Sequence, residues 1–141
     1  MSKSNDIEMQ KDPSAKGNKL FCDAILEQNL NDVTRLIQQV DVNGLNCNGT
    51  TPLIMASGNG HLPVVEALLN HGAVVDKART DNGATPLFMA SGNGHLPVVE
   101  ALLGKGADPN MAITNGATPL YVASLLGYNL VVKALLGKGA D

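Results

Sequence analysis

The apolar residues of this chain recur in a fixed order. The segment Met55–Leu69, which reads MASGNGHLPVVEALL, returns unchanged at 89–103, and a third copy, VASLLGYNLVVKALL, spans 122–136. Within LPVVEALL, the apolar residues Val65 and Leu68 fall at helical spacing, which predicts a helix with one buried face. The pattern therefore predicts a chain built from repeated helical units, each packed on its neighbours.

Each unit contains two predicted helices. The first follows Thr-Pro at residues 51, 85 and 118, because threonine is a good N-cap and proline suits the first helical turn. The second helix, about LPVVEALL, ends at Gly72, Gly106 and Gly139, where glycine favours a C-cap. Polar stretches with Asn-Gly turns at 48, 82 and 115 lead to the next Thr-Pro, which predicts projecting turns between units.

The order of these residues resembles the ankyrin repeat. The pattern G-x-TPL-x-x-A-x-x-x-G-H-x-x-V-V-x-x-LL-x-x-GA-D-x-N occurs in three copies, and a degenerate unit without Thr-Pro precedes them. The resemblance implies an all-α ankyrin-repeat solenoid of stacked helix-turn-helix units with projecting hairpin-like loops. We expect a disordered polar tail over 1–18 and a repeat domain over 19–141. Its units are a degenerate N-terminal cap at 19–43 and repeats at about 44–76, 77–109 and 110–141.

Two departures from the family pattern are visible. The histidine that usually follows TPL is replaced by Ile54, Phe88 and Tyr121. The hydrogen bond that this histidine makes in the family is therefore expected to be absent. The segment 76–83 is also one residue longer than its counterpart 110–116, so we expect one loop tip to bulge.

Charge and composition narrow the classes of partner. The net charge is −3, the pI is about 5.5, and aromatic residues make up only 3 % of the chain. Nucleic acids and anionic membranes favour basic surfaces, and single strands favour aromatic ones, so neither class of partner is expected. No apolar run approaches the roughly 20 residues that span a bilayer, and the polar start has no signal-peptide core.

The two cysteines, Cys22 and Cys47, have no CxxC spacing and no histidine at ligand spacing. We expect two unpaired thiols, with Cys22 buried in the first helix and Cys47 exposed at a loop tip. Such thiols suit a reducing compartment, so a cytoplasmic protein is predicted. Nuclear location and secretion into a host cell are alternatives that the sequence leaves open.

Candidate catalytic groups have structural interpretations. His61 and His95 occupy one slot of adjacent units, too far apart to share a metal ion, and are expected to bond the turn between helices. Ser57 and its counterparts recur in one slot without a nucleophile elbow, and are interpreted as small residues that let helices pack closely. The Gly-Lys pairs at 104 and 137 lack the P-loop serine or threonine. No enzyme activity, metal or cofactor is predicted.

The resemblance implies a protein-protein interaction scaffold, which binds a partner protein through the loop tips and the concave face of the first helices. Tip residues differ between copies while the frame stays constant, which is typical of a binding face on a fixed support. Leu125 and Leu126 replace Gly-Asn of the earlier copies, with Tyr121 one turn before them, and apolar residues of this kind anchor interfaces. The predicted partner-binding residues are Leu45, Cys47, Asn48, Thr50, Arg79, Asp81, Asn82, Phe88, Ala112, Thr114, Asn115, Tyr121, Leu125 and Leu126.

Further expectations concern the end of the chain and Asn110. The chain stops in mid-pattern at Asp141. The alternative hypothesis is therefore the N-terminal targeting module of a larger enzyme, channel or secreted bacterial effector. The last helix, 129–136, has no polar cap, so we expect an apolar forward face and a frayed end. The chain is expected to be monomeric, able to self-associate through that end. Asn110 lies in a stretch resembling those modified by asparaginyl hydroxylases, although a structural turn residue is the favoured interpretation.

Overall fold

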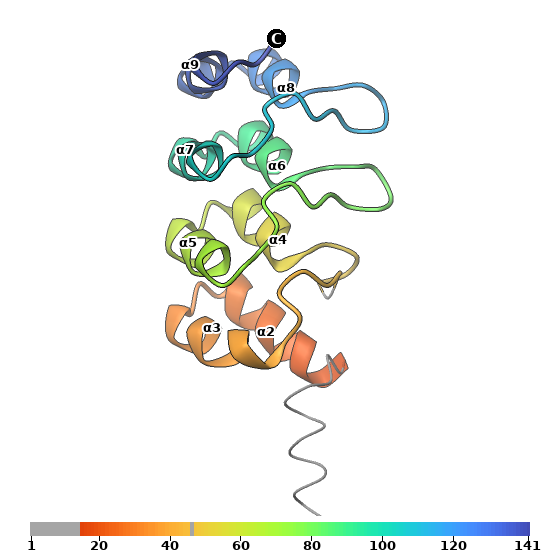
Figure 1. Ribbon diagram of the computed structural model, residues 1–141, viewed down its shortest axis with the longest axis vertical. Helices are drawn as coiled ribbons and strands as arrows, with labels where there is room; N and C mark the ends of the chain where they lie inside the picture. The colour runs from red at the N-terminus through yellow and green to blue at the C-terminus, as the bar shows by residue number, and fades with distance from the viewer. Residues whose placement is uncertain (1–14, 46) are drawn as a thin grey trace, which may run out of the picture.

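The computed structural model describes residues 15–45 and 47–141, and it is a stack of helix pairs with loops projecting to one side (Figure 1). The first helices of the units form one row beside the loops, and the second helices form another. This arrangement confirms the predicted all-α repeat fold. In chain order the helices are α2 (Ala15–Leu26), α3 (Leu30–Leu36), the 3₁₀ helix η1 (Ile37–Gln39), α4 (Pro52–Asn59), α5 (Leu62–Asn70), α6 (Pro86–Gly92), α7 (Leu96–Gly104), α8 (Pro119–Leu126) and α9 (Asn129–Gly137).

The predicted Thr-Pro signals begin helices α4, α6 and α8. In each case the threonine side chain accepts a hydrogen bond from the backbone N–H three residues later, as Thr51 Oγ1 does from Ile54 at 3.1 Å. This bond satisfies one of the backbone donors that a helix start leaves unpaired. The proline occupies the first helical position, where its missing N–H removes no helical bond. The sequence interpretation of these three helix starts is therefore confirmed.

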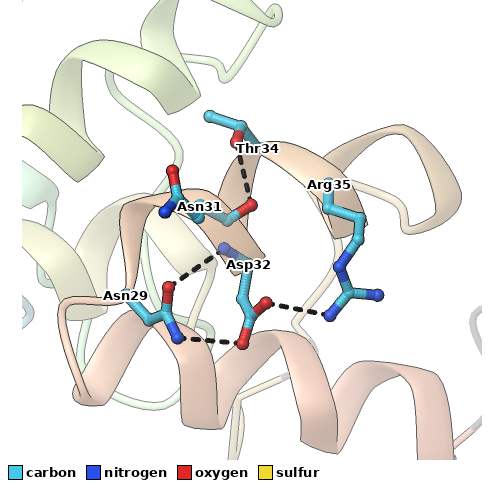
Figure 2. A network of polar contacts seen from close by, with 5 residues as sticks. All are labelled: Asn29, Asn31, Asp32, Thr34 and Arg35. Carbon is cyan, nitrogen blue, oxygen red and sulfur yellow. Dashed lines mark hydrogen bonds and ion pairs between the residues drawn. The ribbon is translucent and has the colours of Figure 1, made fainter.

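The first unit is capped differently. Asn29 begins α3 by accepting a bond from Asp32 N at 3.1 Å, while its amide donates to the Asp32 carboxylate at 2.9 Å. Arg35 donates to the other oxygen of the same carboxylate at 3.0 Å (Figure 2). These groups are wholly or partly exposed, as expected of a terminal unit with a polar outer side. Helix α2 begins at Ala15, so the prediction of a disordered tail is wrong for 15–18, while 1–14 lie outside the described residues.

One hydrophobic core runs through the stack from Phe21 to Ala140. First helices pack on first helices and second helices on second helices, so each unit covers the apolar face of its neighbour. The helix pairs within a unit also close on this core, with Leu68 and Leu102 fully buried in equivalent slots. Burial of this kind contributes about 1.5–3 kcal/mol for each large apolar side chain.

Polar bonds reinforce the stack at the outer connections. Asn43 accepts from Val74 N at 2.7 Å and donates to Gly72 O at 3.1 Å. Two units later, Asn110 makes the equivalent pair of bonds: it accepts from Asp141 N at 3.0 Å and donates to Gly139 O at 3.2 Å. The predicted structural role of Asn110 is thereby supported, and its hydroxylation stays a prediction.

Candidate interaction surface

Three loops project from the stack beside the first helices. We name them loop 1 (residues 44–50, of which 46 is outside the described part), loop 2 (76–84) and loop 3 (110–117). Loop 1 closes through a two-residue turn, with Cys47 N bonded to Thr50 O at 3.2 Å and Asn48 and Gly49 at positive φ. This is the geometry that the Asn-Gly pair predicts for a tight hairpin turn.

Loops 2 and 3 differ in length as predicted. The closing bond of loop 2 joins Arg79 N to Ala84 O at 2.9 Å, whereas that of loop 3 joins Ile113 N to Ala117 O at 2.9 Å, one residue tighter. The extra residue of loop 2 is therefore accommodated at its tip. The two loops also touch, because Thr114 N donates to Asn82 O at 2.9 Å. Neighbouring tips are thus held in register by the backbone as well as by the helices beneath.

A groove with a cavity volume of about 310 Å³ crosses the inner face, by which we mean the surface formed by the loops and helices α2, α4, α6 and α8. Its apolar part comes from Leu26, Met55 and Met89, and its polar part from side chains of the loops and helix ends. Leu26 is exposed and the two methionines are half-buried, so apolar surface faces solvent here. The full lining is Leu26, Cys47, Asn48, Thr50, Ile54, Met55, Gly58, Asn59, Arg79, Met89 and Asn93.

The charge in the groove is compensated. The Arg79 guanidinium donates to Asp81 through two nitrogens, Nε to Oδ1 at 2.8 Å and the terminal nitrogen to Oδ2. This hydrogen bonding lowers the pKa of the Asp81 carboxyl to about 2. A fork-shaped pair of this kind also fixes the side chain of Arg79 along loop 2. The groove therefore presents apolar and amide groups, with its arginine already paired.

The predictions of two unpaired thiols and of an exposed Cys47 are wrong, whereas Cys22 is buried in the first helix as predicted. Cys22 of α2 and Cys47 of loop 1 form a disulfide, and Cys47 is only 3 % exposed. Stacking of the second unit on the first brings loop 1 onto α2, across a sequence separation of 25 residues. Nothing in the local sequence marks this pairing, since neither cysteine lies in a recognisable disulfide framework. Because the two cysteines are paired, they do not indicate a reducing compartment.

The structure gathers most of the predicted partner-binding residues on the loops and on α8. Cys47 and Thr50 are exceptions, because both are buried and shape loop 1 from inside. Arg79 and Phe88 are half-buried. The exposed members are Leu45, Asn48, Asp81, Asn82, Ala112, Thr114, Asn115, Tyr121, Leu125 and Leu126.

A second hollow, of about 460 Å³, lies where loop 3 meets α8. It is lined by residues 115–118 and by Tyr121, whose side chain is 58 % exposed. Two of the predicted contact residues, Asn115 and Tyr121, therefore share one depression. Leu125 and Leu126 follow on the same helix and are 69 % and 53 % exposed.

The exposure of Leu125 follows from its slot in the repeat. In the preceding units this slot holds Gly58 and Gly92, and a Cβ there would lie 3.5 Å from Met89 and 3.4 Å from Val122 respectively. The slot thus faces the following unit. Leu125 stands where that unit would pack, which leaves its side chain uncovered in the described residues. On α9, for which an apolar forward face is predicted, Leu130 and Leu136 are exposed, whereas Val131 and Leu135 are buried.

The histidines and serines have structural surroundings. His61 Nδ1 donates to Ile25 O, and His95 Nε2 donates to Gly58 O, both at 3.0 Å. The histidines are hydrogen-bonded as predicted, but each bond reaches back to the preceding unit, not across its own turn. Ser57 and Ser91 are fully buried between units, which agrees with close helix packing.

Sequence reasoning missed the residues that line the groove from the helices. Leu26 lies outside the recognisable repeats, and Met55, Asn59 and Asn93 belong to segments that are nearly identical between copies. Variation between the copies therefore does not mark these positions. Exposed Asn59 and Asn93, beside glycines at the inner turn, are the signal that could have identified this part of the surface.

The comparisons with known proteins agree with this architecture. A family model described as ankyrin repeats in three copies matches residues 21–113, and one described as an ankyrin repeat matches 115–141. No curated protein matches the chain. Within residues 15–45 and 47–141, no helix has both the length and the apolar character needed to cross a membrane. The family matches extend over most of the sequence, and the chain belongs to the ankyrin-repeat family.

Proposed function

We propose that this protein binds a partner protein through its inner face, with the groove as the central contact. Ankyrin repeats are in general protein-protein interaction modules. The observation that carries the proposal is the groove itself, which joins α2, α4 and α6 with loops 1 and 2. Apolar surface surrounded by polar groups is the usual composition of the centre of a protein interface.

The chemistry of the groove favours an uncharged segment of the partner. Leu26, Met55 and Met89 offer apolar surface, and methionine adapts its shape to different side chains. Asn59 and Asn93 provide amide groups at the edge, although Asn93 already donates to Gly58 O at 2.8 Å. Because Arg79 is paired with Asp81, a strongly acidic ligand would have to displace an existing bond.

The exposed patch of Tyr121, Leu125 and Leu126 is proposed as a second contact. Exposed leucines beside an aromatic ring are costly to leave in water and are frequent in binding sites. We expect the paired change Leu125→Asn with Leu126→Gly to weaken partner binding by about 2 kcal/mol or more with folding intact. The pair introduces the glycine and asparagine of the earlier copies, although in the opposite order.

A matched pair of substitutions tests the groove. Asn59→Lys places a charge at the edge of the inner face, whereas Asn70→Lys makes the same exchange at the exposed end of α5 on the other row of helices. Partners are captured from cells by proximity labelling with the unmodified chain, and each is then titrated by calorimetry. Loss of affinity in Asn59→Lys alone supports the proposal. Equal affinities for both variants and the unmodified chain would remove the groove from the interface.

A further inference from the structure

We propose that the Cys22–Cys47 disulfide is a redox-controlled clamp on the groove, so that the oxidation state of the chain sets the shape of its binding surface. This inference rests on the proposed function for its biological meaning. The dependence of the groove's shape on the disulfide follows from where the two sulfurs lie. Cys47 is itself part of the groove lining, and its partner lies on the neighbouring wall.

The disulfide joins the two walls at the N-terminal side of the groove. One wall is loop 1, which contributes Cys47, Asn48 and Thr50. The other is the end of α2, which contributes Leu26. Cys22 and Leu26 are four residues apart on this helix, and residues at that spacing lie on the same face. The covalent bond at Cys22 therefore fixes the side of α2 from which Leu26 projects.

Loop 1 differs from the other loops in what holds it. Loops 2 and 3 are joined by the backbone bond from Thr114 to Asn82. The bonds that close loop 1, between Cys47 and Thr50, are internal to the loop and do not connect it to another unit. The disulfide is the cross-link that ties loop 1 to α2 of the preceding unit. Breaking that cross-link releases loop 1 from the wall that contains Leu26, and the internal turn, no longer held against α2, opens more often.

The chemical step is a thiol–disulfide exchange with a small-molecule disulfide such as glutathione disulfide. The Cys22 or Cys47 thiolate attacks one sulfur of that disulfide and expels a glutathione thiolate. The second cysteine thiolate then attacks the mixed disulfide and expels the other glutathione. Two electrons and two protons pass from the protein thiols to two molecules of glutathione. Reduction by glutathione reverses both steps.

Because both cysteines are buried, thiol exchange at the disulfide is slow. Cys22 is 8 % exposed and Cys47 3 % exposed, so an attacking thiolate reaches them only after local opening. The first unit lies at one end of the described stack, and α2 packs mainly on α3 and α4. Terminal elements of a stack open more readily than interior ones. The clamp is therefore accessible without unfolding of the later units.

The test compares oxidised and reduced protein without any partner. Methyl-labelled methionine NMR reports on Met55 and Met89 in the groove, with Met111 of loop 3 as an internal reference. Reduction with dithiothreitol is expected to shift the Met55 and Met89 signals and leave Met111 unchanged. Amide exchange at Thr50, which is bonded to Cys47 O, is expected to accelerate by about tenfold or more. Glutathione disulfide should restore both readouts.

The paired variant Cys22→Ala with Cys47→Ala is the control, and its spectrum should match that of the reduced chain and ignore the reductant. Amide protection of α7 must survive reduction. This protection is measured on the unmodified chain, so the test does not depend on whether the variant folds. Unchanged Met55 and Met89 signals overturn the proposal, and so does loss of protection throughout the stack. Because no partner is present, a failed clamp is distinguishable from a failed binding function.

Discussion

Gly60 tests how neighbouring units interlock. It ends α4 with φ +77°, a left-handed conformation that side chains disfavour. A Cβ at this position would lie 2.6 Å from Nδ1 of His95, well inside van der Waals contact. Gly127 ends α8 with nearly the same φ, +81°, and a Cβ there would meet nothing within 4 Å. The two glycines therefore share a backbone conformation and differ in what covers them.

The different surroundings of the two glycines determine how much each alanine substitution should lower the free energy of unfolding. The left-handed conformation costs a non-glycine residue roughly 1–2 kcal/mol, and alanine recovers about 0.4–1 kcal/mol by restricting the unfolded chain. Gly127→Ala is thus expected to destabilise by about 1 kcal/mol. Gly60→Ala must in addition push the His95 ring aside and break its bond to Gly58 O. A lost hydrogen bond and local overpacking bring its cost to about 3 kcal/mol.

The assay is urea unfolding followed by circular dichroism, with amide exchange to identify the unit that opens, because repeat stacks can unfold in parts. The background variant His95→Ala removes the ring. In that background, Gly60→Ala should cost only about 1 kcal/mol, like Gly127→Ala. If Gly60→Ala costs the same with and without the ring, the contact between units contributes nothing and the reasoning is refuted.

Three other predictions concern stability. Reduction of Cys22–Cys47 should lower the free energy of unfolding by about 3.5 kcal/mol, from the entropy of a 25-residue loop, and an unchanged urea midpoint would contradict this. Burial raises the pKa of Asp76, so its contribution to stability falls as pH rises through that pKa. Asp76→Asn should therefore flatten this fall in stability with rising pH, and parallel pH profiles of the two chains would contradict the prediction. The Oγ of Ser91 is buried without a hydrogen-bond partner among the described residues, so Ser91→Ala should raise the melting temperature, and a lowered one would show that the hydroxyl is bonded.

The sequence by itself determined the helices and their order. Thr51-Pro52 and its copies start helices because the side-chain acceptor and the fixed φ of proline act within one turn, independently of distant residues. The near-identical copies then required each unit to pack in the same way on the next. The longer tip of loop 2 also followed from the sequence alone, since the one additional residue must be accommodated there.

Tertiary structure decided which slots meet across units. The disulfide between Cys22 and Cys47, the bonds of His61 and His95 to the preceding unit, and the groove beside Leu26 all join residues at least 20 positions apart along the repeat. A repeat period fixes how often units occur but not the rotation and offset between neighbours. Those two quantities determine which side chains touch, because small per-unit rotations arise from packing at the interface. The binding surface is made at these contacts, which is why it emerged only from the folded stack.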